Sequence, residues 1–308
     1  MLTKTPPKSG HRPLLLLSTK MYFSHSDTLS YTTSLLTLLS SLPTNSNSLQ
    51  HLDVYLLPDF LSLPSVLALL SSHPSTSGNH RLLVGAQDCS PHDYGACTGD
   101  VSPAVLRELG VRLVAVGHAE RRGACPGNGN GKGNGRGETD EEVHLKACAA
   151  ARNGLVPLIC VGERERPLEL TSPDVGGTEE GVEKAAREVV RQVEAAFGRE
   201  FRDGEVFGES EVVVAYEPVW AIGAEEPASV EHVVGVVRRV RESEVLQGRE
   251  GKTRIVYGGA AGLGLWERLE GEVDGLFLGR FAHRPEMFVE VMYEVAGVSG
   301  LTAEKGRE

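Results

Sequence analysis

VVVAYEPVWAIG, residues 212–223, is the stretch that decides the fold of this chain. Its first part is a continuous apolar run, which is typical of a parallel strand buried on both faces. The run delivers Glu217 to the carboxyl end of the strand, and a Trp-bearing segment follows at once. A carboxylate at the mouth of a barrel, shielded from water by a loop, suits proton abstraction beside a carbonyl. The alternative interpretation is a surface glutamate at the end of a strand.

Seven further runs are short and apolar in the same way, and a plausible helix follows each of the eight. They cover residues 14–18, 52–57, 82–86, 111–116, 155–161, 255–257 and 276–278. Apolar strands that alternate with helices indicate a parallel sheet covered on both sides. Eight such units in 308 residues predict a single (β/α)8 barrel, an α/β fold. A doubly wound sheet is the alternative, because strand counts from a single sequence are imprecise.

The predicted barrel spans residues 13–298, between a flexible amino-terminal tail at 1–12 and a carboxyl-terminal tail at 299–308. A Gly/Asn-rich insertion at 123–137 interrupts it. Such a composition has high chain entropy and little to bury, so we expect a mobile segment without catalytic function. A phosphate-cradling loop is the alternative, but no strand-to-helix context of the P-loop kind surrounds the insertion.

Composition and charge argue against several classes of protein. The formal net charge of −11 disfavours a general nucleic-acid binder, which needs a basic face. No apolar run approaches the ~20 residues of a membrane-spanning helix. No two of the five cysteines are spaced as a zinc ligand set, so we expect reduced thiols, a cytoplasmic location, and no metal or cofactor. The first dozen residues carry bases and no acid, which leaves a short organellar presequence open.

Two motifs, GHAERR at 117–122 and AYEPVWAIG at 215–223, resemble those of triose-phosphate isomerases. Further segments match the family pattern in order along the chain, at residues 84–88, 95–103, 160–163, 257–259 and 274–279. The matches extend over most of the chain, and the EPVWAIG string is highly specific. The chain is therefore identified as a divergent member of that family.

The resemblance implies catalytic roles for individual residues. Glu217 would be the general base, and His118 the neutral imidazole that polarises the carbonyl, in the family that is the reference case for this pairing. A helix that begins near Ala119 would keep the imidazole unprotonated. Lys20 would stabilise the developing enediolate, and Glu120 would pair with that lysine. The implied activity is the interconversion of glyceraldehyde 3-phosphate and dihydroxyacetone phosphate, in glycolysis and gluconeogenesis.

The expected substrate- and phosphate-binding positions depart from the family pattern. Ser18 stands where the family has asparagine, Ala260 where it has serine, and Arg280 where it has the second of two glycines. The resemblance implies that Gly223 and Gly279 keep their roles, with backbone amides that reach the phosphate.

Other departures are Ala119, in place of a serine, and Glu225 and Glu226, which add negative charge to the lid, residues 218–226. Three interpretations stay open. Arg280 supplies a guanidinium contact that replaces the lost donors. The pocket is reshaped for another small sugar phosphate, such as a four-carbon tetrulose phosphate. Or the protein keeps the fold and is a weakly active or non-catalytic binding protein. Because base, imidazole and lysine are all retained, an enzyme acting on triose phosphate is the first expectation.

The resemblance also implies a homodimer. The loop 94–101 resembles the family's interdigitating loop, with Thr98 at its tip. Closed two-fold dimers are also the commonest oligomers. The expected partners are a small phosphorylated sugar and a second copy of the chain, with no nucleic acid and no membrane.

Overall fold

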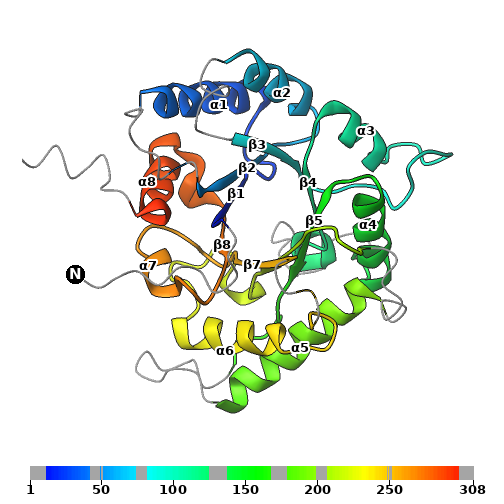
Figure 1. The fold of residues 1–308 in the computed structure, drawn as a ribbon, viewed down its shortest axis with the longest axis vertical. Helices are drawn as coiled ribbons and strands as arrows, with labels where there is room; N and C mark the ends of the chain where they lie inside the picture. The colour runs from blue at the N-terminus through cyan, green and yellow to red at the C-terminus, as the bar shows by residue number, and fades with distance from the viewer. Residues whose placement is uncertain are drawn as a thin grey trace, which may run out of the picture.

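A computed structural model describes residues 12–41, 49, 51–73, 82–124, 137–167, 179–198, 207–247, 249 and 252–297. In Figure 1 the strands form a central ring with helices around it. The strands are β1 (Leu14–Ser18), β2 (Asp53–Leu57), β3 (Leu82–Ala86), β4 (Leu113–Val116), β5 (Val156–Val161), β6 (Val212–Tyr216), β7 (Thr253–Tyr257) and β8 (Gly275–Leu278). Each pairs in parallel with the next, and β8 pairs with β1 to close the barrel. The predicted (β/α)8 barrel is confirmed, and the doubly wound alternative is wrong.

Helices of very different length cover the outside of the barrel. They are α1 (His25–Ser40), α2 (Leu63–Ser72), α3 (Pro103–Leu109), α4 (Asp140–Arg152), α5 (Glu179–Phe197), α6 (Val230–Arg241), α7 (Trp266–Leu269) and α8 (Pro285–Ala296). Three short helical turns follow strands β4, β6 and β8: η3 (Glu120–Ala124), η6 (Val219–Ala221) and η7 (Arg280–His283). These turns follow the carboxyl ends of their strands, so they shape the mouth of the barrel.

The first strand shows why the predicted runs do not alternate between apolar and polar residues. Leu14 and Leu16 belong to the cluster that fills the barrel, together with Phe277 of β8. Leu15 and Leu17 belong to the larger cluster between the sheet and the helices. All four leucines are 0% exposed. Since both faces of the strand are buried, its first four positions are all apolar, and the polar Ser18 comes only at its carboxyl end.

The amino-terminal end of the barrel holds a buried charge network. Arg254 of β7 is 3% exposed, and it pairs with Asp53 of β2 at 2.7 Å and with Glu211. Its guanidinium also donates to the carbonyl of Arg12 at 3.2 Å. Removing one partner would leave a buried charge uncompensated, which is strongly destabilising. The amino-terminal end of the barrel therefore contributes to stability, and we expect the active site at the carboxyl-terminal end.

The tails at 1–12 and 299–308 and the insertion at 123–137 fall almost entirely outside the described residues. The predictions made for them stay predictions. The strands themselves begin and end within two residues of the predicted runs.

Candidate active site

Three of the predicted site residues follow closely on strand ends at one face of the barrel. Lys20 comes two residues after β1, His118 two residues after β4, and Glu217 directly after β6. Parallel strands present all their carboxyl ends at the same face, where barrel enzymes carry their active sites. The fold therefore places residues from distant parts of the sequence around one mouth.

Glu217 and His118 face each other across that mouth. The distance between Glu217 Oε2 and His118 Nε2 is 3.7 Å, and the two residues are 5% and 9% exposed. Glu217 Oε2 is buried and has no hydrogen-bond partner among the described residues. Burying an unpaired carboxylate oxygen costs free energy, so its position indicates function rather than stability.

Gly258, directly after β7, makes room for this carboxylate. A Cβ at position 258 would lie 2.6 Å from Glu217 Cγ and 2.7 Å from its Oε1. The N–H of Gly258 donates to the carbonyl of Tyr216 at 2.9 Å, which ties β7 to β6 directly before the glutamate. This is a close approach of backbone to a functional side chain, which only glycine permits.

A backbone donor fixes the tautomer of His118. The N–H of Glu120 donates to His118 Nδ1 at 3.2 Å, so Nδ1 carries a lone pair and the neutral ring carries its proton on Nε2. That proton is on the side of the facing carboxylate. The N–H groups of Arg121 and Arg122 donate to the carbonyl of His118 and start η3. The helix predicted near Ala119 is in fact this five-residue turn.

Lys20 is joined to the histidine through Glu120. Lys20 Nζ lies 2.8 Å from Glu120 Oε1, and Glu120 Oε2 lies 3.7 Å from His118 Nδ1. Lys20 has φ +47°, a left-handed conformation that is strained for a residue with a side chain. Its N–H donates to Ser18 Oγ, and its carbonyl accepts from Gln87 Nε2, both at 3.1 Å. Gln87 lies in segment 84–88, one of those that match the family pattern, but no local pattern predicts this bracing role.

The predicted substrate- and phosphate-binding residues Gly223, Ala260, Gly279 and Arg280 lie on the loops after β6, β7 and β8, and Ser18 is the last residue of β1. Arg280 Nη2 donates to the carbonyl of Gly223 at 3.1 Å, so the guanidinium contacts the lid. Ala260 has φ +45°, so the loop after β7 also holds a strained residue.

Positive charge gathers on the β1 and β8 side of the mouth. Burial lowers the pKa of His283 and the charges of Lys20 and Arg280 lower it further, against a hydrogen bond to the Ser18 carbonyl that raises it. A Cβ on Gly279 would have no heavy atom within 4 Å. Open space beside cationic side chains suits a phosphate dianion.

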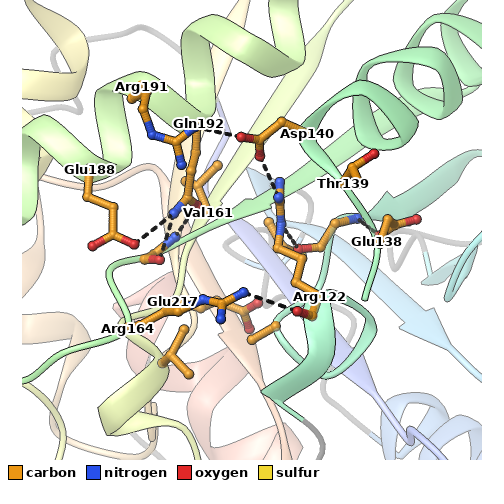
Figure 2. Close-up of a pocket in the computed structure, with 15 residues that line it drawn as sticks. Arg122, Glu138, Thr139, Asp140, Val161, Arg164, Glu188, Arg191, Gln192 and Glu217 are labelled. Carbon is orange, nitrogen blue, oxygen red and sulfur yellow. Dashed lines mark hydrogen bonds and ion pairs between the residues drawn. The ribbon is translucent and has the colours of Figure 1, made fainter. Parts of the chain in front are cut away.

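A cavity of about 200 Å³ lies beside Glu217, on the β4 and β5 side (Figure 2). Ala119 and Cys160 contribute to its wall together with the glutamate. Charged groups line much of the remainder, among them Arg122, Glu138, Asp140, Arg164, Glu188 and Arg191. Burial raises the pKa of the Cys160 thiol well above its usual range, and the charge of Glu217 adds to the rise. The base therefore borders a small polar space.

A barrel in which a carboxylate faces a neutral imidazole, with a lysine beside them, defines the class of isomerases that move a proton between carbons. The chain belongs to the triosephosphate isomerase family, whose family model matches residues 13–295. The predicted family and the predicted enzyme class, an aldose–ketose isomerase, are confirmed.

The relatives carry two different names. An L-erythrulose-1-phosphate isomerase of Pectobacterium atrosepticum is 35% identical over 291 residues, which cover 94% of this chain and 98% of that protein. A triosephosphate isomerase of Lactiplantibacillus plantarum is 33% identical over 245 residues, or 77% of this chain and 86% of the relative. One of Alkalilimnicola ehrlichii is 36% identical over 245 residues, or 78% and 84%. Sequence identity at this level shows the family but does not identify the substrate.

The described part of the chain contains no helix with the length and apolarity needed to cross a membrane. Over the same residues, no group of three or more His, Cys, Asp or Glu side chains is arranged to hold a metal ion. The thiols of Cys89, Cys97, Cys148 and Cys160 are free.

Proposed function

We propose that the protein isomerises a small ketose phosphate through an enediolate. Glu217 takes a proton from the carbon next to the carbonyl and returns it to the neighbouring carbon. His118 donates its Nε2 proton to the carbonyl oxygen and takes up the proton of the neighbouring hydroxyl, whose carbon becomes the new carbonyl, while Lys20 stabilises the negative charge that develops between the two steps. The proposal is carried by the 3.7 Å separation of Glu217 Oε2 and His118 Nε2, at a buried carboxylate oxygen without a partner in the described chain.

The phosphate binds, in this proposal, on the side of the mouth formed by the loops after β6, β7 and β8. Backbone amides of Gly223, Ala260 and Gly279 supply donors, and the Arg280 guanidinium supplies a fork that can bind two phosphate oxygens. The contact between Arg280 and the Gly223 carbonyl supports this arrangement, because it brings the guanidinium to the lid. Ser18 lies at the β1 side and supports the lysine.

Two substrates fit this chemistry. Triose phosphates, with a role in glycolysis and gluconeogenesis, follow from the family and from the relatives named triosephosphate isomerase. L-Erythrulose 1-phosphate follows from the relative that matches 94% of this chain. Its ketone is at C2 and its C1 carries the phosphate ester, so the carbonyl can move only to C3.

We propose the four-carbon substrate as the preferred one. L-Erythrulose 1-phosphate is dihydroxyacetone phosphate with a hydroxymethyl group on the carbon that gives up its proton. That group needs room beside Glu217, away from the phosphate. The cavity bordered by Ala119 and Cys160 offers about 200 Å³ on that side. Ala119 is also smaller than the serine of the family pattern, which leaves more space next to the base.

Steady-state kinetics with L-erythrulose 1-phosphate, dihydroxyacetone phosphate and glyceraldehyde 3-phosphate tests both the isomerase activity and the preference for the four-carbon substrate. We expect turnover of all three, with kcat/KM for the four-carbon compound higher by at least about tenfold, which is ~1.4 kcal/mol of transition-state binding. A higher value for the trioses would make the protein a triose-phosphate isomerase. No turnover of any of them would contradict the enzyme and favour a binding protein.

We also propose a homodimer located in the cytoplasm. Met21, Leu61 and Tyr94 follow three consecutive strands and are 95%, 86% and 74% exposed. Large exposed apolar side chains on loops at the same end of a barrel are consistent with an interaction surface. Thr98 of the loop 94–101 is also exposed in the single chain and so is available to a partner.

A further inference from the structure

Gln192 of α5 holds the peptide of Gly162 through both ends of its side-chain amide. Its Oε1 accepts from the N–H of Gly162, and its Nε2 donates to the carbonyl of the same residue, each at 3.0 Å (Figure 2). Nε2 also lies 3.5 Å from Glu188 Oε1. Gln192 is 6% exposed. The contacts leave one orientation for this buried amide, because only Oε1 can accept from the backbone N–H.

Gly162 lies between two residues that support the backbone of the proposed base. Its neighbours Val161 and Glu163 accept, through their carbonyls, the N–H groups of Glu217 and Val219 at 2.8 and 3.0 Å. The backbone groups of successive residues in a strand point to opposite neighbours, so those of Gly162 point away from β6 and towards β4. One side of this segment therefore carries the glutamate, and the other side needs partners of its own.

Strand β4 does not supply those partners, because it has already ended. Its last residue, Val116, pairs with Ile159 of β5, and Gly117 then turns the chain with φ +72°. Gly162 is buried, and a buried N–H or carbonyl without a partner costs free energy. The amide of Gln192 offers one acceptor and one donor at this point, so a side chain takes the place of a neighbouring strand.

The Gly162 peptide is in close contact with the backbone of Glu217. A Cβ at position 162 would collide with the Glu217 carbonyl and would lie 3.2 Å from the nitrogen of Pro218. A shift of this peptide would therefore be passed on to the glutamate. A catalytic group that is misplaced by about 1 Å can cost about 10² in rate.

We infer that Gln192 is a positioning residue for Glu217. Its amide fixes the end of β5, and the end of β5 holds the backbone around the glutamate through the hydrogen bonds of Glu217 and Val219. Gln192 thus acts on the proton transfer through the Gly162 peptide, without touching the substrate itself. The inference rests on the proposed function, in which Glu217 moves the proton between carbons.

Gln192→Met tests this role, because methionine keeps the length of the side chain and forms neither hydrogen bond. We expect kcat on the preferred sugar phosphate to fall at least about tenfold, at a temperature well below the melting temperature of the variant. KM should stay within about threefold, since the phosphate is proposed to bind on the loops after β6, β7 and β8. Unchanged kcat, or a rise in KM alone, would overturn the inference.

Arg249→Met is the matched control for a loss of stability. Arg249 is 7% exposed, and its guanidinium donates to the carbonyls of Gly208 and Ser210 at 3.0 and 2.7 Å, just before β6. It therefore braces the opposite end of the strand that delivers Glu217. We expect a lower melting temperature and a kcat within about twofold of the parent protein. An equal loss of kcat in both variants would mean that any weakening of β6 suffices, and would overturn the inference.

A double-mutant cycle with Glu217→Gln separates positioning of the base from other effects of Gln192. Without a base there is nothing to position, so the addition of Gln192→Met should lower the residual kcat by less than about twofold. An undiminished tenfold loss would show that Gln192 acts on something other than Glu217, and would overturn the inference as well.

Amide hydrogen exchange follows the same contact without turnover. The N–H groups of Gly162 and Glu217 should exchange at least about tenfold faster in Gln192→Met than in Arg249→Met. Equal exchange of Glu217 in the two variants would overturn the inference. The absence of turnover by the parent protein would refute the proposed function instead, and the exchange rates would still show whether Gln192 fixes the backbone of Glu217.

A second variant keeps the test open if Gln192→Met fails to fold, as judged by circular dichroism. Gln192→Asn keeps the amide on a side chain that is one methylene shorter, so it cannot bond both backbone groups of Gly162. We expect a loss of kcat of at least about threefold and faster exchange of Glu217. Parent-like kcat and parent-like exchange in this variant would contradict the inference.

Discussion

Glu217 is held in place by the backbone around it. Its N–H donates to the carbonyl of Val161 at 2.8 Å. A Cβ on Gly162 would lie 1.9 Å from the Glu217 carbonyl oxygen, so this neighbour also has to be glycine. The side-chain oxygen Oε2 adds no hydrogen bond within the described chain. Changes to the carboxyl group should therefore affect the chemistry far more than the fold.

Glu217→Gln is the direct test of the base. The amide keeps the size of the side chain and cannot take up the proton, so kcat should fall by about 10²–10⁴. Steady-state kinetics on the preferred substrate measures the loss, and thermal unfolding should show a melting temperature close to that of the parent. Turnover at the parent rate would mean that another group moves the proton.

Arg280→Ala tests the guanidinium as a phosphate ligand. If Arg280 binds phosphate, KM should rise at least tenfold, or ~1.4 kcal/mol, and inhibition by inorganic phosphate should weaken in parallel. Arg280→Lys is the matched control, because it keeps the positive charge and loses the forked guanidinium. Its KM should lie between those of the parent protein and Arg280→Ala. Unchanged KM and unchanged inhibition in Arg280→Ala would limit the residue to its contact with the lid at Gly223.

Ala119→Ser tests the space beside the base. The added hydroxyl should hinder the extra hydroxymethyl group and lower the ratio of kcat/KM for L-erythrulose 1-phosphate over dihydroxyacetone phosphate by about tenfold, within the 1–3 kcal/mol that one group of this size is worth. Ala260→Ser makes the same chemical change in the loop after β7, which in the proposed function binds the phosphate common to both substrates, so it should leave the ratio unchanged. An equal effect of both variants on the ratio would refute the assignment of the cavity.

At the scale of the element, the strands were predictable and the contacts between loops were not. The apolar runs could be read directly because both faces of every strand are buried. The segment after His118 was predicted as a helix, but Gly123 adopts φ +96° there and the helical turn ends after five residues. The contacts of Arg280 with Gly223 and of His232 with Glu163 join residues 57 and 69 positions apart. Such pairs are set by the closure of the barrel, which no local pattern encodes.

The Gly/Asn-rich segment is the element whose removal should matter least. Residues 128–135 lie outside the described part of the chain, and their composition predicts no contribution to the core. Because loop-closure entropy depends only weakly on length, their deletion should leave kcat and KM within about twofold. A Gly/Ser segment of equal length in the same place is the control. A large loss of activity on deletion alone would show that the segment braces η3 and with it His118.

In the whole molecule, one end of the barrel contributes to stability and the other carries the candidate active site. The network around Arg254 stabilises the amino-terminal end, and the side chains proposed for catalysis and the exposed apolar residues lie on loops at the carboxyl end. A partner that covers Met21, Leu61 and Tyr94 would therefore sit next to the active site and could hold its loops in place.

Light scattering tests the dimer. We expect the mass of two chains at micromolar concentration, because a closed two-fold interface would bury the exposed apolar side chains of loop 94–101 and its neighbours. Tyr94→Glu should shift the mass towards one chain and lower kcat, while Leu263→Glu, an exposed residue after β7, should change neither. A single-chain mass for the parent protein across the same range would contradict the proposal.

Gly258 also constrains how the gene can vary. Every missense change in a glycine codon introduces a Cβ, and at this position that atom would lie 2.6 Å from Glu217 Cγ. Under the proposed function, exchanges at positions such as Ser18 and Ala119 shift the preference from one sugar phosphate to another. Substitutions at codon 258 are selected against for as long as the proton transfer is required. A saturation library at this codon, selected for growth on the substrate, should therefore return only glycine.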